Sequence, residues 1–195
     1  VGPDVPLMAD LNEGFTVKGA LAIAQGLAES GFLWLEEPVL PDDLPGYRRL
    51  ADNLPMALAG GEALCGLGSF RDFITAGVLD VVQPDLAICG GITEGLRIAA
   101  LADAFDVPLV PHVWGTGINF HASLHFAAIQ PAKRGAGAGY PFFEFDYSPN
   151  PLRETFGGVD IAKDGTVAVP DGPGLGIEIT ADTFARFLTS RWSVG

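Results

Sequence analysis

The stretch Phe32-Leu-Trp-Leu-Glu36-Glu37-Pro38 decides the fold class of this chain. Four apolar residues in a row, followed by carboxylates and a proline turn, are typical of a parallel strand that is buried on both faces. Similar short apolar runs occupy residues 7–10, 56–59, 79–82 and 107–111, and segments with helical periodicity separate them, at residues 16–27, 46–53, 69–76, 93–105 and 119–129. The alternation predicts an α/β fold in which helices cover a parallel sheet.

Ionisable residues stand at or just beyond the carboxyl ends of five successive runs. They are Asp10, Glu36, Glu62, Asp85 and His112, at intervals of 26, 26, 23 and 27 residues. A closed barrel gathers the carboxyl ends of its strands around one mouth, whereas an open sheet spreads them along an edge. One such residue per strand therefore favours an incomplete TIM-type (β/α) barrel of about six parallel strands, in which residues 142–145 supply the sixth.

The chain changes character after this barrel pattern. We expect residues 1–148 to form the partial barrel and residues 149–195 to form a C-terminal tail that packs on it. The tail is predicted to hold a strand pair within 159–169, a turn-rich stretch at 170–174 and a short helix over 181–188. The first residue is Val rather than Met, and the opening residues resemble the middle of a protein, so we expect a portion of a longer protein.

Composition narrows the classes of partner. The 195 residues carry 11 Lys plus Arg against 24 Asp plus Glu, for a net charge of −13, which argues against binding to nucleic acid or to an anionic membrane surface. No apolar run reaches the roughly 18 to 20 residues of a membrane span. Cys65 and Cys89 form no CxxC pair, and a cytoplasmic location is expected.

Three of the strand-end residues are carboxylates that would repel one another if brought together. A divalent cation among Asp10, Glu36 and Glu62 would relieve that repulsion, and an all-oxygen set favours Mg²⁺, with Mn²⁺ or Ca²⁺ as alternatives, over Zn²⁺. The alternative is that each carboxylate only caps the helix that follows it. Glu37 should face away from Glu36, since neighbouring strand residues point to opposite sides, and a structural role is expected for it.

Asp85 and His112 end adjacent predicted strands. Such a pair could form a hydrogen bond in which the carboxylate fixes the imidazole tautomer and raises its basicity, so that His112 becomes a candidate general base or acid. The alternative is a core histidine anchored by a polar neighbour. Trp114, in the loop after His112, could line the substrate or simply pack. His121 and His125 are four residues apart but lack the zincin glutamate, so we expect no metal there.

These motifs together resemble a known family. The chain resembles the barrel of the enolase superfamily, in its mandelate racemase/muconate lactonizing enzyme branch, through Asp10-Leu-Asn12, Trp34-Leu-Glu36-Glu37-Pro38, Gly60-Gly61-Glu62, Gln83-Pro84-Asp85, Gly90-Gly91-Ile92 and Pro111-His112. The segments 111–117, 144–146 and 170–178 are most similar to members that act on sugar diacids and their lactones, among them cycloisomerases and acid-sugar dehydratases.

The resemblance implies a role for each residue. It implies Mg²⁺ ligation by the three carboxylates already named and an acid/base role for Asp85 and His112 on one face of the substrate. It also implies that Asn12 lies near a substrate hydroxyl and that a protonated Glu144 donates a hydrogen bond to the substrate carboxylate. The implied reaction removes the proton next to the carboxylate of a sugar acid or lactone, followed by dehydration or lactone opening.

Other outcomes stay open at the level of sequence. A racemase or epimerase of the same branch would return the proton without loss of water. From another class, the chain could be a non-catalytic acidic module that binds a metal. The resemblance places the six strands as the third to eighth of the family's barrel, without the N-terminal capping domain or the second strand with its Lys motif. We therefore expect the chain alone to be inactive. The resemblance also implies that the full-length protein forms a homo-oligomer.

Overall fold

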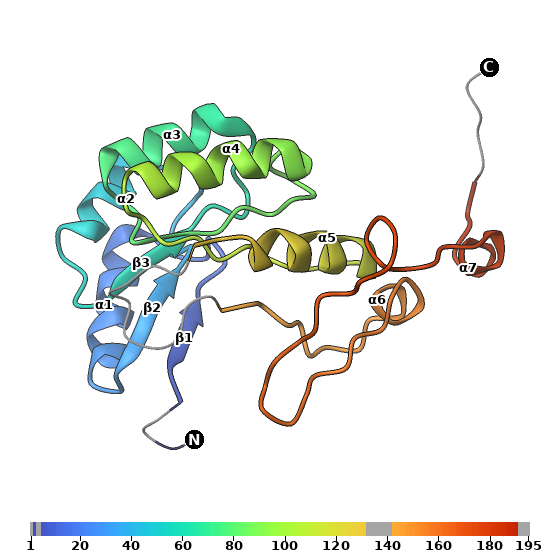
Figure 1. Ribbon diagram of the computed structural model, residues 1–195. Coiled ribbons are helices and arrows are strands. Elements are labelled where there is room, and N and C mark those ends of the chain that lie inside the picture. The colour runs from blue at the N-terminus through green and yellow to red at the C-terminus, as the bar shows by residue number, and fades with distance from the viewer. Residues whose placement is uncertain (1, 3–4, 132–141, 191–195) are drawn as a thin grey trace.

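The computed structural model describes residues 2, 5–131 and 142–190 (Figure 1). Its centre is a parallel sheet of four strands in the order β1-β2-β3-β4. These strands are β1 (Leu7–Asp10), β2 (Phe32–Glu36), β3 (Ala57–Gly60) and β4 (Val81–Val82). Each strand lies beside the next one in the chain, as the repeated strand–helix order requires, and the predicted α/β class is confirmed.

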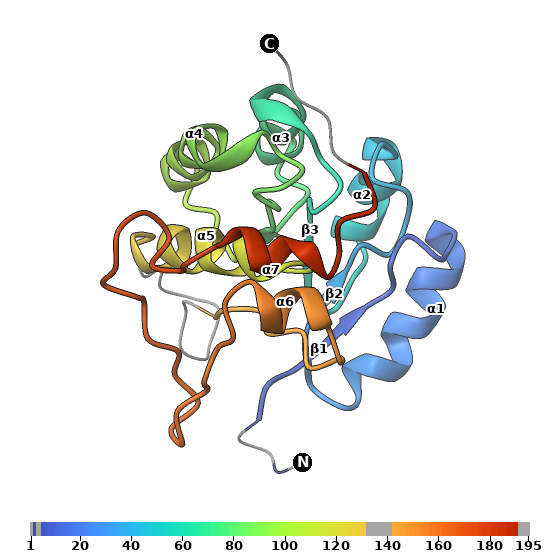
Figure 2. The same cartoon turned by 90° about the vertical axis from the view of Figure 1, so that its right-hand side faces the viewer.

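A helix follows each strand and packs outside the sheet. The helices are α1 (Val17–Ala28), α2 (Leu44–Ala51), α3 (Gly66–Ala76) and α4 (Gly91–Ala104), and Figure 2 shows them as an arc around the strands. Short polar residues start two of them: Thr16 Oγ1 accepts the Gly19 N–H at 3.2 Å, and Asp43 Oδ1 accepts the Gly46 N–H at 2.9 Å. The helix α3 ends at Gly77, whose φ of 62° lies in the left-handed region.

The core fills the layer between the sheet and these helices. Its largest fully buried apolar side chains include Tyr47, Leu50, Leu58, Phe70 and Ile98. They come from α2, β3, α3 and α4, so the same apolar layer fixes the helices and the strand between them. Burial of these apolar side chains is the main source of stability for the packing of α1 to α4 on the sheet. The same contacts fix the register of the strands.

The fifth predicted strand, at 107–111, is reduced to backbone bridges. Parallel bridges join Val82 to Leu109 and Asp85 to His112, and the Val110 N–H donates to the Val82 carbonyl at 3.0 Å. The segment therefore lies where a fifth strand would lie. Pro108 has no N–H to donate toward β4, and Pro84 has none to donate in the other direction, which explains why no continuous ladder forms.

Two predictions for the rest of the chain need correction, and one helix was not predicted. Residues 142–145 form no strand, and the Val113 N–H donates to the Glu144 side chain, not to a backbone carbonyl of this segment. Residues 159–169 hold no strand pair but a turn, in which the Ala162 N–H donates to the Thr166 carbonyl at 2.9 Å. The helix α6 (Pro151–Thr155) was not predicted, although Asn150 followed by proline is a helix-start signal.

The segment after residue 149 packs against α5 (Gly117–Ala128). His121 Nε2 lies 3.2 Å from the Gly157 carbonyl, and His125 Nε2 lies 3.2 Å from the Leu175 carbonyl. Each histidine therefore ties the tail to α5. The last helix, α7 (Ala181–Ala185), lies beyond α6 and away from the sheet, and it is shorter than the predicted 181–188. The boundary between 148 and 149 remains a prediction.

Within the described ranges, no helix has the length and apolar character that a membrane crossing would require.

Gly117 lets the backbone at the end of α6 approach α5 closely. A Cβ at this position would meet the Phe156 carbonyl oxygen, and it would stand 2.6 Å from the Phe156 carbonyl carbon and 2.8 Å from the Arg153 carbonyl oxygen. We expect Gly117→Ala to lower the free energy of unfolding by about 1–3 kcal/mol, since backbone atoms must move apart. Urea denaturation measures the change.

Gly68 provides the matched control. It lies within α3, and a Cβ there would meet nothing within 4 Å. Gly68→Ala should therefore stabilise the chain by about 0.5–1 kcal/mol through helix propensity. Equal effects of the two substitutions would show that the contact between α5 and α6 is not tight.

Candidate active site

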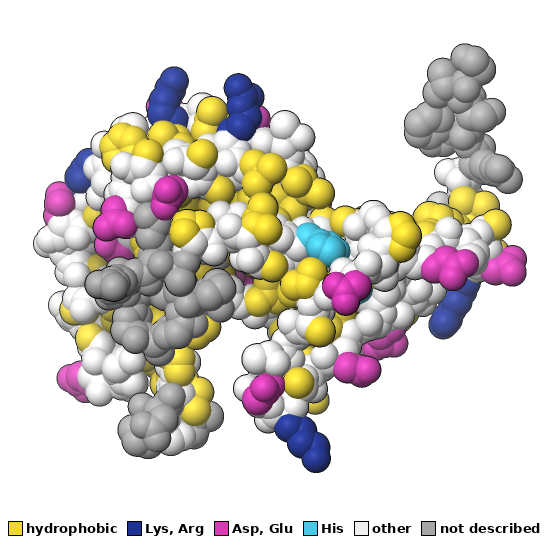
Figure 3. Space-filling view, in the orientation of Figure 1, with side chains coloured by type: hydrophobic (Ala, Val, Ile, Leu, Met, Phe, Trp, Pro, Cys, Tyr) yellow, Lys and Arg dark blue, Asp and Glu magenta, His cyan; other side chains and the backbone are white. Residues whose placement is uncertain are grey.

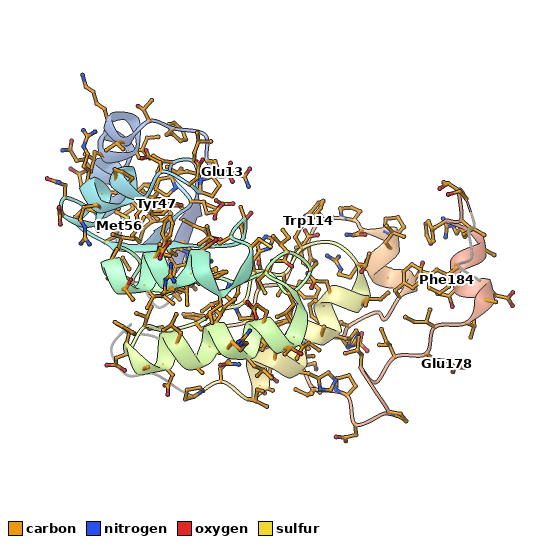
Figure 4. The ribbon with its side chains drawn as sticks, turned by 90° about the horizontal axis from the view of Figure 1, so that it is seen from above. Glu13, Tyr47, Met56, Trp114, Glu178 and Phe184 are labelled. Carbon is orange, nitrogen blue, oxygen red and sulfur yellow. The ribbon has the colours of Figure 1, made fainter. Side chains whose placement is uncertain are left out.

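Parallel register brings the strand-end residues to one edge of the sheet. Asp10 of β1 pairs with Glu36 of β2, and Glu36 pairs with Ala59 of β3, three residues before Glu62. The loop after β1 continues this pairing, since the Glu13 N–H donates to the Glu37 carbonyl at 2.7 Å. Figure 4 labels Glu13 in the loop after β1, Trp114 in the loop before α5, and Met56 in the loop that precedes β3.

Asp85 and His112 form a hydrogen-bonded pair. Asp85 Oδ2 lies 2.7 Å from His112 Nδ1. The other carboxylate oxygen, Oδ1, accepts the Ala87 N–H at 2.7 Å, and the Asn119 side-chain amide reaches both oxygens, at 3.2 and 3.4 Å. Asp85 is only 2% exposed, and both of its carboxylate oxygens have hydrogen-bond partners. Because Nδ1 of His112 is hydrogen-bonded to Asp85, Nε2 is the imidazole nitrogen on the side of Glu62.

The surroundings of His112 favour its charged form. Burial alone would lower the imidazole pKa, but the hydrogen bond to Asp85 and the charges of Glu144, Glu62 and Asp85 outweigh burial and raise the pKa to about 9. His112 Nε2 lies 3.3 Å from Glu62 Oε2, so the imidazolium stands between two carboxylates. Proton exchange at Nε2 is the chemistry that this arrangement supports.

The carboxylates at the ends of β2 and β3 are crowded. Burial raises the pKa of the Glu36 carboxyl, opposed by hydrogen bonds from Gln83 and Trp34, and the Trp34 Nε1–H donates to Glu36 Oε2 at 2.9 Å. Burial also raises the pKa of Glu62 to about 7; His112 opposes the rise, and the charges of Glu37, Asp10 and Glu36 add to it. The negative charges therefore act on one another across the strand ends.

A cavity of about 290 Å³ opens beside these groups. Its polar lining consists of Asp10, Trp34, Glu36, Gln83 and Glu144. Within the part of the chain that the structure describes, the buried Gln83 side-chain oxygen has no hydrogen-bond partner. Such an atom, next to two carboxylates, provides an unused ligand site for a polar or positively charged guest.

Glu144 joins this cavity to the loop after His112. Its Oε2 accepts the Val113 N–H at 2.5 Å. Burial raises the carboxyl pKa, and the charges of Glu36 and Asp10 also raise it, whereas the Val113 hydrogen bond and His112 lower it. A raised pKa favours the protonated carboxyl, which can donate a hydrogen bond as well as accept one.

The two predicted substrate-binding residues, Asn12 and Trp114, are both exposed. The Asn12 backbone N–H donates to Asp10 Oδ1 at 2.7 Å, and the φ of 43° at Asn12 turns the chain sharply away from β1. Trp114 is 65% exposed, so its ring is not part of the core of this chain. Both side chains are accessible from solvent, and their contacts with a substrate remain predictions.

The three predicted metal ligands lie near one another but do not converge on one point. Among residues 5–131 and 142–190, no three His, Cys, Asp or Glu side chains converge closely enough to hold an ion. Glu36 is engaged by Trp34, and Glu62 is turned toward His112. The donors nevertheless fit Mg²⁺ in chemical type, because they are all oxygens, and in charge, because Asp10 raises the pKa of both Glu36 and Glu62.

A family model described as enolase C-terminal domain-like matches residues 1–183. The chain belongs to this family. Among curated relatives, D-galactarolactone cycloisomerase of Agrobacterium fabrum is 42% identical over 189 residues, which cover 96% of this chain and 50% of that protein. Arabinonate dehydratase of Saccharolobus solfataricus is 32% identical over 188 residues, which cover 96% of this chain and 48% of that protein.

Solved structures agree with the family assignment. The crystal structure of 3,6-anhydro-D-galactonate cycloisomerase from Zobellia galactanivorans has a TM-score of 0.85 and 34% identity, and the match covers 97% of this chain and 52% of that one. An enolase-superfamily member from Polaromonas sp. JS666 has a TM-score of 0.86 and 40% identity, with 95% and 48% covered. This enolase-type chain thus spans about half the length of the curated relatives it matches.

Sequence reasoning gave no separate role to two polar residues of this enolase-type site, Asn119 and Gln83. Asn119 contacts Asp85, and Gln83 lines the cavity. Glu37, 1% exposed, accepts the Gly61 N–H at 3.1 Å and so braces the chain next to Glu62. Gln83 could have been found from its place two residues before Asp85 at a strand end. No local pattern marks Asn119, because 34 residues separate it from Asp85.

The His112 environment predicts a titration. In the metal-free chain, the imidazole should titrate with a midpoint near the pKa of about 9. Asp85→Asn should move the midpoint down, because the hydrogen-bonding carboxylate is lost. The imidazole resonances in NMR measure it. Asp72→Asn, which removes an exposed carboxylate paired with Arg71, is the control and should leave the midpoint unchanged. A midpoint at or below 6.5 in the unaltered chain would contradict the assignment.

The same groups make stability depend on pH. Glu62 and His112 have raised pKa values in the folded state, so the folded chain binds more protons than the unfolded chain between 4.5 and about 7 and between 6.5 and about 9, respectively. The free energy of unfolding of the metal-free chain should therefore fall as pH rises through these windows. Urea denaturation at a series of pH values tests this. Glu62→Gln should flatten the lower window, and a rising free energy there would refute the sign.

Proposed function

We propose that the complete protein removes the proton next to the carboxylate of a sugar acid or its lactone, with dehydration or lactone opening as the outcome. The observation that carries the proposal is the Asp85–His112 pair, with 2.7 Å between Oδ2 and Nδ1, at the same sheet edge as three carboxylates. The named relatives act on sugar acids and lactones as cycloisomerases and dehydratases, which supports this class of substrate. This chain is proposed to be the barrel portion of the enzyme.

His112 is the proton-transferring group in this proposal. Its Nδ1 is tied to Asp85, so Nε2 is the nitrogen that exchanges protons. The neutral imidazole, formed when Nε2 has released its proton to solvent, takes the α-proton, and the C–H electron pair moves into the carboxylate. When a β-oxygen leaves, that pair forms the new double bond, and the departing oxygen needs a proton. The imidazolium formed at His112 can supply this proton if the leaving group lies on the same face.

Asp10, Glu36 and Glu62 are proposed to hold Mg²⁺, with Mn²⁺ as an alternative. When bound, the cation offsets the second negative charge that develops on the substrate carboxylate. Glu62 would have to turn from His112 toward the other two carboxylates, which would also release Nε2 for the substrate. The cation would offset the repulsion among the three carboxylates, and this gain would favour the rearrangement.

The remaining residues orient the substrate. A protonated Glu144, held at Oε2 by the Val113 N–H, can donate a hydrogen bond to the substrate carboxylate. Asn12 is proposed to bind a substrate hydroxyl, and the exposed Trp114 ring to form one wall. The proposed partner is a small molecule. The full-length protein is proposed to be a homo-oligomer in the cytoplasm.

Turnover by the complete protein tests the reaction class. We expect Mg²⁺-dependent exchange of the α-proton, together with loss of water or ring opening, on at least one member of a panel of hexaric and aldonic acids and lactones. NMR in D₂O follows both events in one sample. Exchange without loss of water or ring opening would identify a racemase or epimerase instead. Metal binding with neither event would identify a non-catalytic module.

Replacement of Glu36 tests the metal ligands separately from turnover. Glu36→Ala should abolish Mg²⁺ binding by calorimetry, because it removes the central carboxylate of the three. Glu29→Ala is the control, since Glu29 is an exposed carboxylate at the end of α1, away from the carboxyl ends of the strands. Undiminished Mg²⁺ binding by Glu36→Ala would exclude this ligand set.

A further inference from the structure

Asn119 occupies a junction that the proposed reaction does not use directly. It lies in the first turn of α5, and its side-chain nitrogen, Nδ2, has three acceptors. These are Asp85 Oδ1 at 3.2 Å, Asp85 Oδ2 at 3.4 Å and the Trp114 carbonyl at 3.2 Å. An amide has two N–H bonds, so one can be shared across the carboxylate while the other points to the carbonyl.

Three groups contact the carboxylate of Asp85, and Asn119 is one of them. Asp85 Oδ1 also accepts the Ala87 N–H, and Asp85 Oδ2 faces His112 Nδ1, each at 2.7 Å. The backbone donor comes from the same loop as Asp85 itself. Asn119 is the contact that ties the carboxylate to another element, α5, and so resists rotation of the carboxylate about its own axis.

The second acceptor connects Asn119 to the loop that carries Trp114. Side chains from three parts of the chain hold successive backbone groups of this loop. Glu144 accepts the Val113 N–H at 2.5 Å, Asn119 donates to the Trp114 carbonyl, and Asn150 donates to the Gly115 carbonyl at 2.7 Å. Of the two asparagines, Asn119 touches both the loop and the carboxylate.

We propose that Asn119 is a positioning residue that fixes the Asp85–His112 pair and the Trp114 loop in one relation to each other. It rests on the proposed function, in which His112 exchanges a proton with a substrate that Trp114 lines. The amide does not meet the substrate. It sets the distance between the group that moves the proton and the wall that places the substrate, a distance on which the rate of proton transfer depends steeply.

Asn150 supplies the matched control. It holds the next carbonyl of the same loop with the same chemistry, from the start of α6. If Asn119 merely anchored the loop, removal of either asparagine would have the same effect. If Asn119 also orients the carboxylate, Asn119→Ala should lower kcat, whereas Asn150→Ala should act mainly on KM.

Three variants of the complete protein carry the test. For α-proton exchange, we expect Asn119→Ala to reduce kcat by about 10- to 100-fold, the scale of a lost outer hydrogen-bond partner, with a smaller change in KM. Asn119→Asp keeps the shape but removes both N–H bonds and sets a second carboxylate against Asp85, so kcat should fall at least as far. A negative charge in the first turn of α5 favours the helix, so this variant should fold. Asn150→Ala should raise KM and leave kcat close to that of the unaltered protein.

A spectroscopic measurement is independent of turnover. The His112 Nδ1 proton, hydrogen-bonded to Asp85, should give a separate low-field NMR signal that is protected from rapid exchange with water. The signal should weaken or broaden in Asn119→Ala and persist in Asn150→Ala. Equal signals and equal kcat values in the two variants, or full activity in Asn119→Asp, would overturn the inference.

The two levels of proposal fail in different ways. Absence of metal-dependent exchange in the unaltered protein would reject the proposed function, while the imidazole signal would still report whether Asn119 orients Asp85. Exchange in the unaltered protein together with indistinguishable asparagine variants would reject the inference alone.

Discussion

Parallel register at the carboxyl edge of the sheet is the constraint on which the rest of the structure depends. The pairs Asp10 with Glu36 and Asp85 with His112 follow from the ladder, because side chains alternate between faces with a period of two. A slip of one residue in any strand would turn its terminal charge into the core. The core layer of Leu58, Phe70 and Ile98 opposes such a slip, so packing far from the mouth keeps the acidic groups together.

The strand ends were predictable because they are marked by residue type and by spacing. An apolar run followed by Asp, Glu or His appears five times, and the structure brings all five residues to the same edge. The ladder beyond β4 was harder to predict, since Pro108 keeps the apolar character of a strand but has no N–H to donate. Residues 142–145 have the apolar character of a strand too, but the Val113 N–H beside them bonds to the Glu144 side chain and not to their backbone.

Contacts of the loop after His112 were not predictable from any local pattern. Asn150 reaches the Gly115 carbonyl across 35 positions, and Asn119 reaches Asp85 across 34. Each asparagine has another plausible reading in sequence, as a turn residue or a helix-start residue, and Asn150 does start α6. Long-range polar contacts of this kind follow only from the placement of α5 beside the strand ends, which depends on the whole fold.

The loop after His112 is held by its backbone rather than by its side chains. Glu144, Asn119 and Asn150 bind the N–H of Val113 and the carbonyls of Trp114 and Gly115, while the Trp114 ring stays in solvent. Residue 114 can therefore change identity without moving the chain that carries it. Under the proposed function, a change of the side chain at 114 would alter the wall of the substrate site and leave the Asp85–His112 geometry in place.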